Sequence, residues 1–346
     1  MSNTMRPIVL TPKVKYSLEC LLPKSYSAEI ATLDRLEAAK IAAEAHRRAR
    51  GVLQDQIQPG MSLLEIAEII ESSTKILLGQ GYNQGIGFPT GLSLNSCAAH
   101  DTPNPKSKPT LLSANDVLKV DFGTQVDGYI IDSAFTVTFN PEYENLLLAA
   151  RESVYACLKI AGPDVPLDLI GETADEVIRS YELTIDGRTV PIRPVANLNG
   201  HTINRFKIHG GKYVPIVKRS GNRDRMEVGE FYAFETFATT GNGLVVEKGD
   251  CSHYMATNKK VNSRLEGVKT LQTYIQDKFN GLPFCKRYIG PEIKCADVYL
   301  KQLEKAGGVE GYPPLCDSPG SLVAQFEHTL FVKEGGIEVL SKGDDY

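Results

Sequence analysis

Residues 117–133 constrain the fold more than any other stretch, because they predict a β-hairpin whose register can be worked out. Two runs of β-branched and aromatic residues flank an Asp-Gly dipeptide at 127–128, which is typical of a tight two-residue turn. With this turn at the loop, Gly123 lies opposite Asp132. Asp121 then lies diagonal to Asp132 on the same face, roughly 7–8 Å away at the backbone, and glycine leaves the space between them open. We therefore expect both carboxylates to reach toward one point.

Two aspartates on one face of a hairpin allow two interpretations. Aspartate is depleted in strands, and two buried carboxylates repel each other unless a cation lies between them. Alternatively, both aspartates face solvent on an edge hairpin, because Asp-rich hairpins are common. The hairpin alone leaves both interpretations open, so the rest of the chain has to decide between them.

Composition narrows the class of protein. The chain of 346 residues is 42% hydrophobic and 23% charged, which is typical of a globular protein with a large core. A net charge of −4 gives no support for non-specific binding to DNA or to a membrane surface. No apolar run approaches the ~18–20 residues that cross a bilayer, and the N-terminus does not resemble a signal peptide. The seven cysteines show no CxxC spacing, so we expect reduced thiols and a cytoplasmic protein.

Two helices and a loop are predicted ahead of the hairpin. Residues 27–56 repeat apolar side chains at helical spacing, and His46 is expected on a solvated part of this helix. A capping box at Ser62 opens a second helix, which is expected to end near residues 79–81. A loop rich in glycine and proline, residues 85–105, then leads into the hairpin.

The same order of elements recurs after the hairpin, which indicates a duplicated unit. Aligning Asp121 with Glu235 places a carboxylate at the same point of each half. An insertion of about residues 252–312 interrupts the second half. The predicted elements are helices at 142–161 and 167–183, a Gly-rich loop at 199–211, a strand at 231–237, helices at 262–280 and 294–305, and a strand at 322–332.

Five side chains in these segments have the chemistry of metal ligands. Four are acids on predicted strands and one is a histidine in a Gly-rich loop: Asp121, Asp132, Glu235, Glu327 and His201. Carboxylates with one imidazole suit a first-row divalent metal, and four carboxylates can balance two such ions. Paired metals roughly 3.5–4 Å apart lower the pKa of a bridging water and polarise an amide carbonyl. A lone glutamate on a strand is usually a surface residue, so the order of all five along the chain carries the prediction.

Several motifs are similar to those of the type 2 methionine aminopeptidases, which share the pita-bread fold with creatinase and prolidase. The matching motifs are FPTGLSLNSCAAH at 88–100, the hairpin with its two aspartates, residues 200–217, FET at 234–236 and QFEHT at 325–329. The resemblance covers nearly all the chain from about residue 30 onward. It implies an α/β pita-bread fold, with duplicated helix–helix–strand halves around a curved antiparallel sheet. Residues 1–26 would be an N-terminal segment, and residues 27–346 a catalytic domain that includes the helical insertion.

The resemblance assigns the five candidate ligands to two divalent metal ions. Asp132, His201 and Glu327 would bind one ion, and Asp121, Glu235 and Glu327 the other. Asp121 would be bidentate, with Asp132 and Glu327 bridging the pair. Glu235 would also take a proton from the bridging water. The choice among Mn, Co, Fe and Zn stays open, because such sites are filled largely according to metal availability.

The resemblance also assigns two catalytic histidines and a methionine pocket. His209 would hold the scissile carbonyl and its developing oxyanion. His100 would pass a proton to the leaving amine. An apolar pocket edged by aromatic rings suits a thioether side chain. Its lining would be Phe88, Ile208, His253 and Tyr312, together with His100 and His209.

The implied substrates are the N-termini of nascent polypeptides whose second residue is small. Fumagillin-like epoxides, which resemble inhibitors of the family, are expected to alkylate His100. Eukaryotic members of the family usually carry a long charged N-terminal extension, whereas few residues precede the first helix here, so ribosome docking is in doubt. We expect a monomer with no DNA or membrane partner.

Two alternatives stay open. The first is a prolidase-type peptidase, although such enzymes carry an extra domain ahead of the catalytic half, for which this N-terminus has no room. The second is a non-enzymatic binding protein on the same scaffold. Binding proteins of the proliferation-associated type lose metal ligands, whereas all five are present here. Hydrolysis of a Met-Ala-Ser peptide with Mn²⁺ or Co²⁺, abolished by EDTA, would separate an enzyme from a binding protein.

Overall fold

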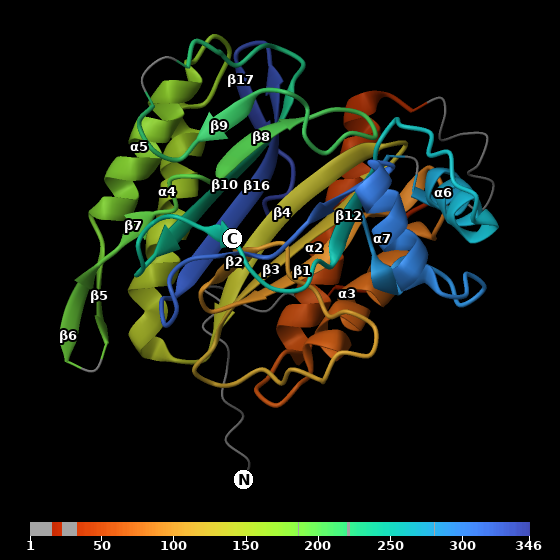
Figure 1. Ribbon diagram of the computed structural model, residues 1–346. Coiled ribbons are helices and arrows are strands. Elements are labelled where there is room, and N and C mark those ends of the chain that lie inside the picture. The colour runs from red at the N-terminus through yellow and green to blue at the C-terminus, as the bar shows by residue number, and fades with distance from the viewer. Residues whose placement is uncertain (1–15, 23–32, 186, 220–221, 280) are drawn as a thin grey trace.

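Two antiparallel sheets lie side by side at the centre of the molecule and have helices on both faces (Figure 1). This mixed arrangement confirms the predicted α/β class. None of the described helices is long and apolar enough to span a bilayer. The structure is a computed structural model that describes residues 16–22, 33–185, 187–219, 222–279 and 281–346.

The predicted hairpin belongs to the first sheet. Val126 lies opposite Tyr129 and Gly123 opposite Asp132, which confirms the expected register. The turn residue Asp127 has a positive φ of 52°, as a tight hairpin turn of this type requires. The strands, in spatial order, are β1 (Gln84–Leu94), β3 (Val117–Val126) and β4 (Tyr129–Thr138).

Strand β1 occupies much of the region that the sequence predicts to be a loop, so that prediction is wrong. β1 is an edge strand, and its pairing with β3 shifts register on both sides of Phe88. An edge strand with bulges tolerates Pro89, because proline there removes no regular ladder hydrogen bond. A Cβ at Gly123 would overlap the Phe88 ring. The space above Gly123, expected to be open, is therefore filled by Phe88.

The second sheet carries His201, Glu235 and Glu327. His201 lies on a strand, not in the predicted Gly-rich loop, because its segment pairs with both neighbouring strands. The strands predicted at 231–237 and 322–332 are confirmed, with differences of one or two residues at their ends. In spatial order the sheet consists of β17 (Gly336–Val339), β16 (Val323–Lys333), β10 (Phe231–Thr239), β8 (Asn199–Ile203) and β9 (Tyr213–Pro215), and β7 (Arg193–Pro194) also pairs with β10.

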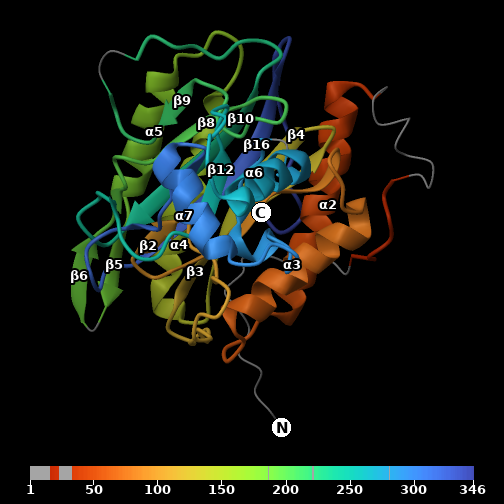
Figure 2. The same cartoon turned by 45° about the vertical axis from the view of Figure 1, so that its right-hand side comes forward.

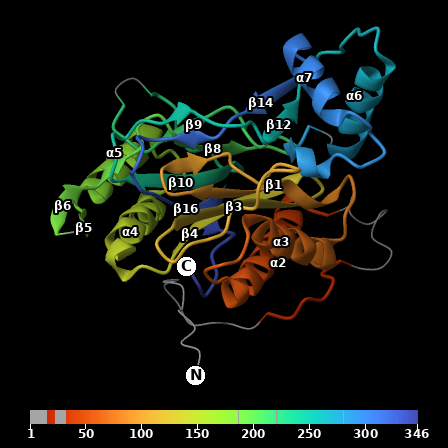
Figure 3. The same cartoon turned by 60° about the horizontal axis from the view of Figure 1, so that its bottom comes forward.

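Four helices cover one face of the sheets, as Figure 3 shows. The capping box at Ser62 is present as predicted. Residues 27–32 of the first predicted helix lie outside the described residues, as does most of the segment 1–26, so the boundary between the predicted domains stays a prediction. The helices are α2 (Arg35–Gln56), α3 (Leu63–Leu78), α4 (Glu144–Ile160) and α5 (Leu167–Arg179), with a 3-10 turn at Pro141–Tyr143.

Two details of these helices differ from the predictions. His46 is fully buried, with its ring stacked on Phe122 at a centroid distance of 3.8 Å, and not solvated. The second difference is α5, which ends at Arg179 and not near residue 183. The residues that follow form the strand Glu182–Ile185, which pairs with Arg188–Pro191. Cross-strand pairing therefore overrides the helical pattern there.

The insertion forms a separate layer on the other face of the sheets (Figure 2, Figure 3). It has its own cluster of buried side chains, including Leu271, Phe284 and Leu303. Arg287 anchors it to α3 through hydrogen bonds to both carboxylate oxygens of Glu71. Its elements are β12 (His253–Ala256), α6 (Glu266–Phe279), β13 (Phe284–Cys285), a 3-10 turn at Lys286–Tyr288, α7 (Ala296–Ala306) and β14 (Val309–Tyr312).

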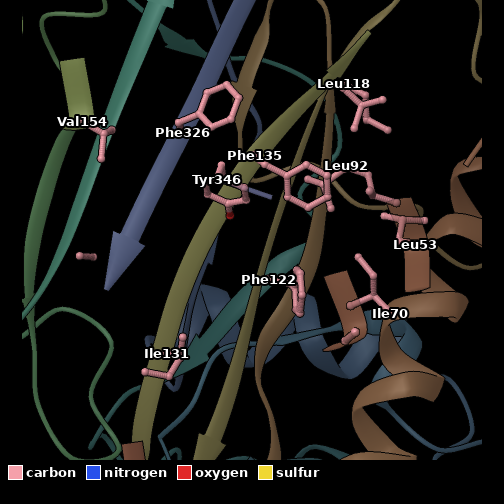
Figure 4. Packing of buried hydrophobic residues seen from close by; sticks show 14 of the residues in the cluster. Leu53, Ile70, Leu92, Leu118, Phe122, Ile131, Phe135, Val154, Phe326 and Tyr346 are labelled. Carbon is pink, nitrogen blue, oxygen red and sulfur yellow. The ribbon is translucent and has the colours of Figure 1, made fainter. Parts of the chain in front are cut away.

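The largest hydrophobic core lies between helices α2 and α3 and the hairpin (Figure 4). Leu53 and Ile70 from the helices are buried in the same cluster as Phe122 and Phe135 from the hairpin. The apolar face of the hairpin is thus held by the helices. A small sheet consists of β2 (Cys97–Ala99), β15 (Leu315–Cys316) and β11 (Val246–Glu247). Its strand β2 ends directly before His100.

Candidate active site

A cavity of about 400 Å³ lies where the two sheets meet the insertion. Four of the five predicted metal ligands line it, and Glu327 is buried with 1% of its surface exposed. All six residues predicted for substrate binding also line it: Phe88, His100, Ile208, His209, His253 and Tyr312. The structure therefore brings side chains from distant parts of the sequence to one cavity.

The five predicted ligands come from five different strands. Asp121 lies on β3, Asp132 on β4, His201 on β8, Glu235 on β10 and Glu327 on β16. The pairing of β10 with β16 places Glu235 directly opposite Glu327. Side chains directly opposite on one face approach within roughly 4.5–5.5 Å at Cβ, so these two glutamates are neighbours.

Hydroxyl groups connect the two sheets at the seam between β4 and β16, which lie side by side (Figure 1, Figure 2). The described residues of these strands belong to different sheets and share no backbone ladder. Instead, Asp132 N donates to Thr329 Oγ1 (2.8 Å), and Thr329 Oγ1 donates to Asp132 O (2.6 Å). Ser133 Oγ donates to Glu327 O at 2.7 Å. Thr136 Oγ1 likewise donates to Gln325 O and accepts from Gln325 N.

Three of the predicted ligands form a compact group. Asp132, His201 and Glu327 each offer a ligand atom, and these atoms lie within 4.8 Å of one another. The separation between Asp132 Oδ2 and His201 Nε2 is 3.5 Å. Asp121 and Glu235 are joined differently, because Gln325 Nε2 donates to Asp121 Oδ2 (3.3 Å) and to Glu235 Oε2 (3.0 Å).

Among the described residues, no lysine or arginine forms an ion pair with the carboxylates of this cavity. Burial raises the pKa of Asp121, Asp132, Glu235 and Glu327, and neighbouring acids raise the pKa of the last three further. Asp121 Oδ1 and both carboxylate oxygens of Glu327 are buried and accept no hydrogen bond from a described donor. Buried anions are costly unless they are paired or bind a metal. These orphaned oxygens, arranged around one histidine, are a donor set that fits divalent metal ions.

His201 has the form that a metal ligand requires. Burial lowers its pKa to about 3, with a further contribution from His209, so the ring is neutral near pH 7. His201 Nδ1 lies 3.2 Å from Thr202 O, a group that can only accept, so Nδ1 carries the proton. Nε2 is then the free nitrogen, and it points toward Asp132. A backbone carbonyl that orients a histidine in this way is typical of metal sites.

Three further histidines, His100, His209 and His253, line the same cavity. The His209 ring meets the His201 ring edge-on, at 4.7 Å between centroids. The His100 ring lies 6.0 Å from His253 and 5.8 Å from Tyr312. Burial, reinforced by His209, lowers the pKa of His100 to about 4. A neutral ring at this position can accept or donate a proton without carrying a standing charge.

Sequence reasoning missed Gln325, which donates to two of the predicted ligands. Gln325 lies two residues before Glu327, so both side chains point to one face of the strand, and this period could have identified it. Met255 and Pro283 also line the cavity and extend its apolar wall. Met255 lies two residues after His253, the same spacing that separates Gln325 from Glu327. Pro283 has no sequence pattern that would have revealed it. Further residues that line the cavity are Asn197, Leu198, Asn199, Lys212 and Tyr213.

Comparison with known proteins gives consistent matches. Residues 36–334 match the family model described as metallopeptidase family M24. The chain is 50% identical over 312 residues to methionine aminopeptidase 2 of Clavispora lusitaniae, which covers 88% of this chain and 71% of that protein. It is 48% identical over 318 residues to methionine aminopeptidase 2 of Kluyveromyces lactis, covering 88% and 75% respectively.

Solved structures share the fold at much lower sequence identity. A thermophilic Arx1 aligns with a TM-score of 0.73 at 17% identity, over 89% of this chain and 90% of that chain. A methionine aminopeptidase from Thermotoga maritima aligns with a TM-score of 0.57 at 19% identity, over 93% and 100%. Such alignments show a common architecture of the backbone.

Proposed function

This chain belongs to metallopeptidase family M24, and from that premise we propose that it removes the first methionine from polypeptides whose second residue is small. The family has the pita-bread fold predicted from the sequence. The names of its relatives at about half identity support the choice of methionine. The observation that carries the proposal is the group of buried acids beside an apolar pocket, in which Asp121 Oδ1 and both carboxylate oxygens of Glu327 have no described donor.

The proposed centre holds two divalent metal ions. Asp132, His201 and Glu327 would hold one, and Asp121, Glu235 and Glu327 the other, with Asp132 shared between the two like Glu327. Two ions bound there would supply an activated water and a polarised scissile carbonyl. Gln325, which donates to Asp121 and Glu235, keeps these two acids in place. Mn, Co, Fe and Zn all suit this mixture of oxygen and nitrogen ligands.

The remaining polar groups have proposed roles in binding and proton transfer. Glu235 would accept the proton of the attacking water. His209 would donate to the carbonyl oxygen as negative charge develops on it, which is most effective in a site that excludes water. His100 would deliver a proton to the leaving amine. The lowered pKa of both His100 and His209 supports neutral rings that donate from one nitrogen.

The shape of the cavity supports the choice of substrate. Phe88, Ile208 and Met255 give an apolar wall, and His253 and Tyr312 add aromatic edges. An unbranched thioether packs well against such edges, because sulfur favours contacts with rings. The insertion, which contributes His253 and Tyr312, is expected to restrict the space available beyond the scissile bond. We propose nascent polypeptides as the substrates on this basis.

The direct test is hydrolysis of Met-X-Ser peptides by the full chain with Mn²⁺ or Co²⁺. Peptides with Gly, Ala, Ser, Thr or Val as the second residue should be cut, and those with Lys or Phe scarcely. EDTA should abolish the reaction, and a norleucine peptide serves as a control for the size of the first side chain. A flat profile across second residues, or no turnover with metal bound, would overturn the proposal and favour a binding protein.

Alkylation by fumagillin-like epoxides supplies a second test of the pocket. A hydrophobic tail in the methionine pocket would leave the epoxide near His100, whose neutral ring is a nucleophile. One adduct per chain should form at His100, located by peptide mass mapping. His100→Asn should remain unlabelled, and an adduct on His209 or a cysteine would show that His100 has been placed wrongly.

A further inference from the structure

A second buried polar cluster lies behind the strands that carry the predicted ligands. Ser133 directly follows Asp132, and His328 directly follows Glu327. Successive side chains of a strand point to opposite faces, so these two residues face away from the cavity. The cluster, called the rear cluster here, consists of the buried residues His46 and Arg50 from α2, Ser133 from β4, His328 from β16, Ser341 and Tyr346, together with the partly exposed Asp345.

Tyr346 is the centre of the rear cluster. Its ring stacks on His328 at 4.9 Å between centroids and 21° between planes. The guanidinium of Arg50 lies over the Tyr346 ring, 4.3 Å from the ring centroid, and forms a cation–π contact with it. Figure 4 shows Tyr346 beside Phe135, in the space between the sheets and the helices. The whole residue is 6% exposed.

A directed chain of hydrogen bonds runs from Arg50 to the backbone of Glu327. Glu327 O can only accept, so the single proton of Ser133 Oγ is committed to it, at 2.7 Å. The 3.0 Å contact between Ser133 Oγ and the Tyr346 hydroxyl must then have tyrosine as the donor. The tyrosine oxygen in turn accepts from Arg50 Nη1 at 3.3 Å. Each group therefore orients the next.

The rear cluster also holds the backbone next to Asp132. His46 Nε2 lies 3.2 Å from Ser133 O and 2.9 Å from Phe122 O, which connects both strands of the hairpin. On β16, Ser341 Oγ accepts from Thr329 N at 3.0 Å. Thr329 is the residue that binds both backbone groups of Asp132. The rear cluster thus contacts the seam on both sides of the Asp132–Glu327 pair.

We propose that Tyr346 is a positioning residue for the metal centre. No backbone ladder connects β4 to β16 in the described residues, so the separation of Asp132 from Glu327 depends on a few hydroxyl links. Tyr346 orients one of these links, that of Ser133, directly behind both carboxylates. Metal affinity is sensitive to groups that hold ligands in place. This inference rests on the two-metal centre of the proposed function.

The test compares Mn²⁺ binding by the wild type and Tyr346→Phe, both prepared as metal-free full chains. The variant keeps the ring stacked on His328 but loses the hydroxyl. Calorimetric titration should show Mn²⁺ affinity lowered by about tenfold, the lower end of the effects of outer groups on metal sites. At limiting Mn²⁺ kcat should fall with KM unchanged, and saturating Mn²⁺ should restore it. Tyr155→Phe is the matched control, because Tyr155 approaches His328 at 6.0 Å without contacting Ser133.

Ser133→Ala makes the test independent of general stability. If the hydroxyl acts through Ser133, Tyr346→Phe should lower the affinity no further in a Ser133→Ala background. Equal Mn²⁺ affinity of Tyr346→Phe and wild type would overturn the inference, even if the variant unfolds earlier. Additive losses in the double variant would also overturn it. Failure of the proposed function has a different signature, which is normal Mn²⁺ binding by the wild type without hydrolysis of any methionyl peptide.

Discussion

The two faces of the seam between β4 and β16 both bury polar side chains, but they satisfy them differently. On the cavity face, both oxygens of Glu327 lack a described donor, and burial raises the pKa of its carboxyl group. On the rear face, burial alone would raise the pKa of Asp345, but the charge and hydrogen bonds of Arg50 lower it below its usual value. Arg50 Nη2 donates to Asp345 Oδ1 at 2.6 Å.

This difference separates a ligand site from a structural cluster. Burial of a carboxylate identifies neither, because both faces bury carboxylates. What distinguishes them is whether the protein itself supplies the counter-charge. The rear cluster contains its own cation, whereas no described cation pairs with the acids of the cavity face, for which we propose metal ions as the counter-charge. Substitutions on the two faces should therefore have opposite consequences for activity and stability.

The largest expected effect is the loss of activity in Asp132→Ala. Asp132 is proposed to contact both metal ions, so its removal should reduce peptide turnover to the detection limit. Metal analysis should show fewer than two bound ions per chain. Glu334→Ala, which removes an exposed acid beyond β16, is the control and should retain full activity. Two bound ions with full turnover in Asp132→Ala would contradict the assignment.

The rear face should show the largest loss of stability. Arg50→Met removes the cation from a buried pair, and leaving one buried partner costs about 3–5 kcal/mol. Urea unfolding of the metal-free chain should show this loss as a lower midpoint. Arg179→Met removes an exposed pair with Asp175 on α5, which should cost under about 1 kcal/mol. If both arginine variants lose the same small amount, the rear cluster is not the structural face.

Metal should stabilise the folded state through the cavity face. A ligand that binds only the folded chain adds about 2.7 kcal/mol at a hundredfold excess over its Kd. The thermal midpoint of the wild type should therefore rise with Mn²⁺ and fall again with EDTA. Asp132→Ala should lose most of this shift, whereas Arg179→Met should keep it. A shift of equal size in Asp132→Ala would mean that the metal binds elsewhere.

The smallest expected effect is a dependence of stability on pH that originates in His46. Burial, aided by Arg50 and Arg47, holds the pKa of His46 well below 6.5, against the opposing effect of its carbonyl partners. His46 therefore takes up a proton at a higher pH in the unfolded chain than in the folded chain. The stabilisation of the folded state by neutral His46 is complete above pH 6.5 and is lost as the pH falls. At pH 5.5 the loss is about 1.4 kcal/mol.

His46→Gln is the variant that isolates this contribution. The difference in unfolding free energy between wild type and His46→Gln should change between pH 7.5 and 5.5, when both are measured in urea with EDTA. The amide of glutamine can still donate to Phe122 O. A difference that stays constant with pH would mean that His46 does not supply the acid sensitivity of the rear cluster.

Local sequence patterns were sufficient for the parts of the fold that depend on neighbouring residues. The Asp-Gly turn determines the register of the hairpin, and the capping box determines the start of α3, because each involves groups a few residues apart. The candidate ligands were predicted from acids and a histidine placed in a known order along the chain. Gln325 was within reach of the same reasoning, since it shares a strand face with Glu327.

Only the tertiary structure decided which distant segments supply the packing and hydrogen-bond partners of a given residue. His46 looked solvated because its helical neighbours are basic, yet it is buried because Phe122 and Ser133 lie against it. The strand β1 forms from a Gly- and Pro-rich segment because β3 supplies its ladder. Ser133 and Tyr346 are 213 residues apart in the chain, and their contact depends on how the segment that follows β17 packs against β4. Periodicity describes which face of an element is apolar, but the partner of a buried polar group is determined by which other elements pack against that face.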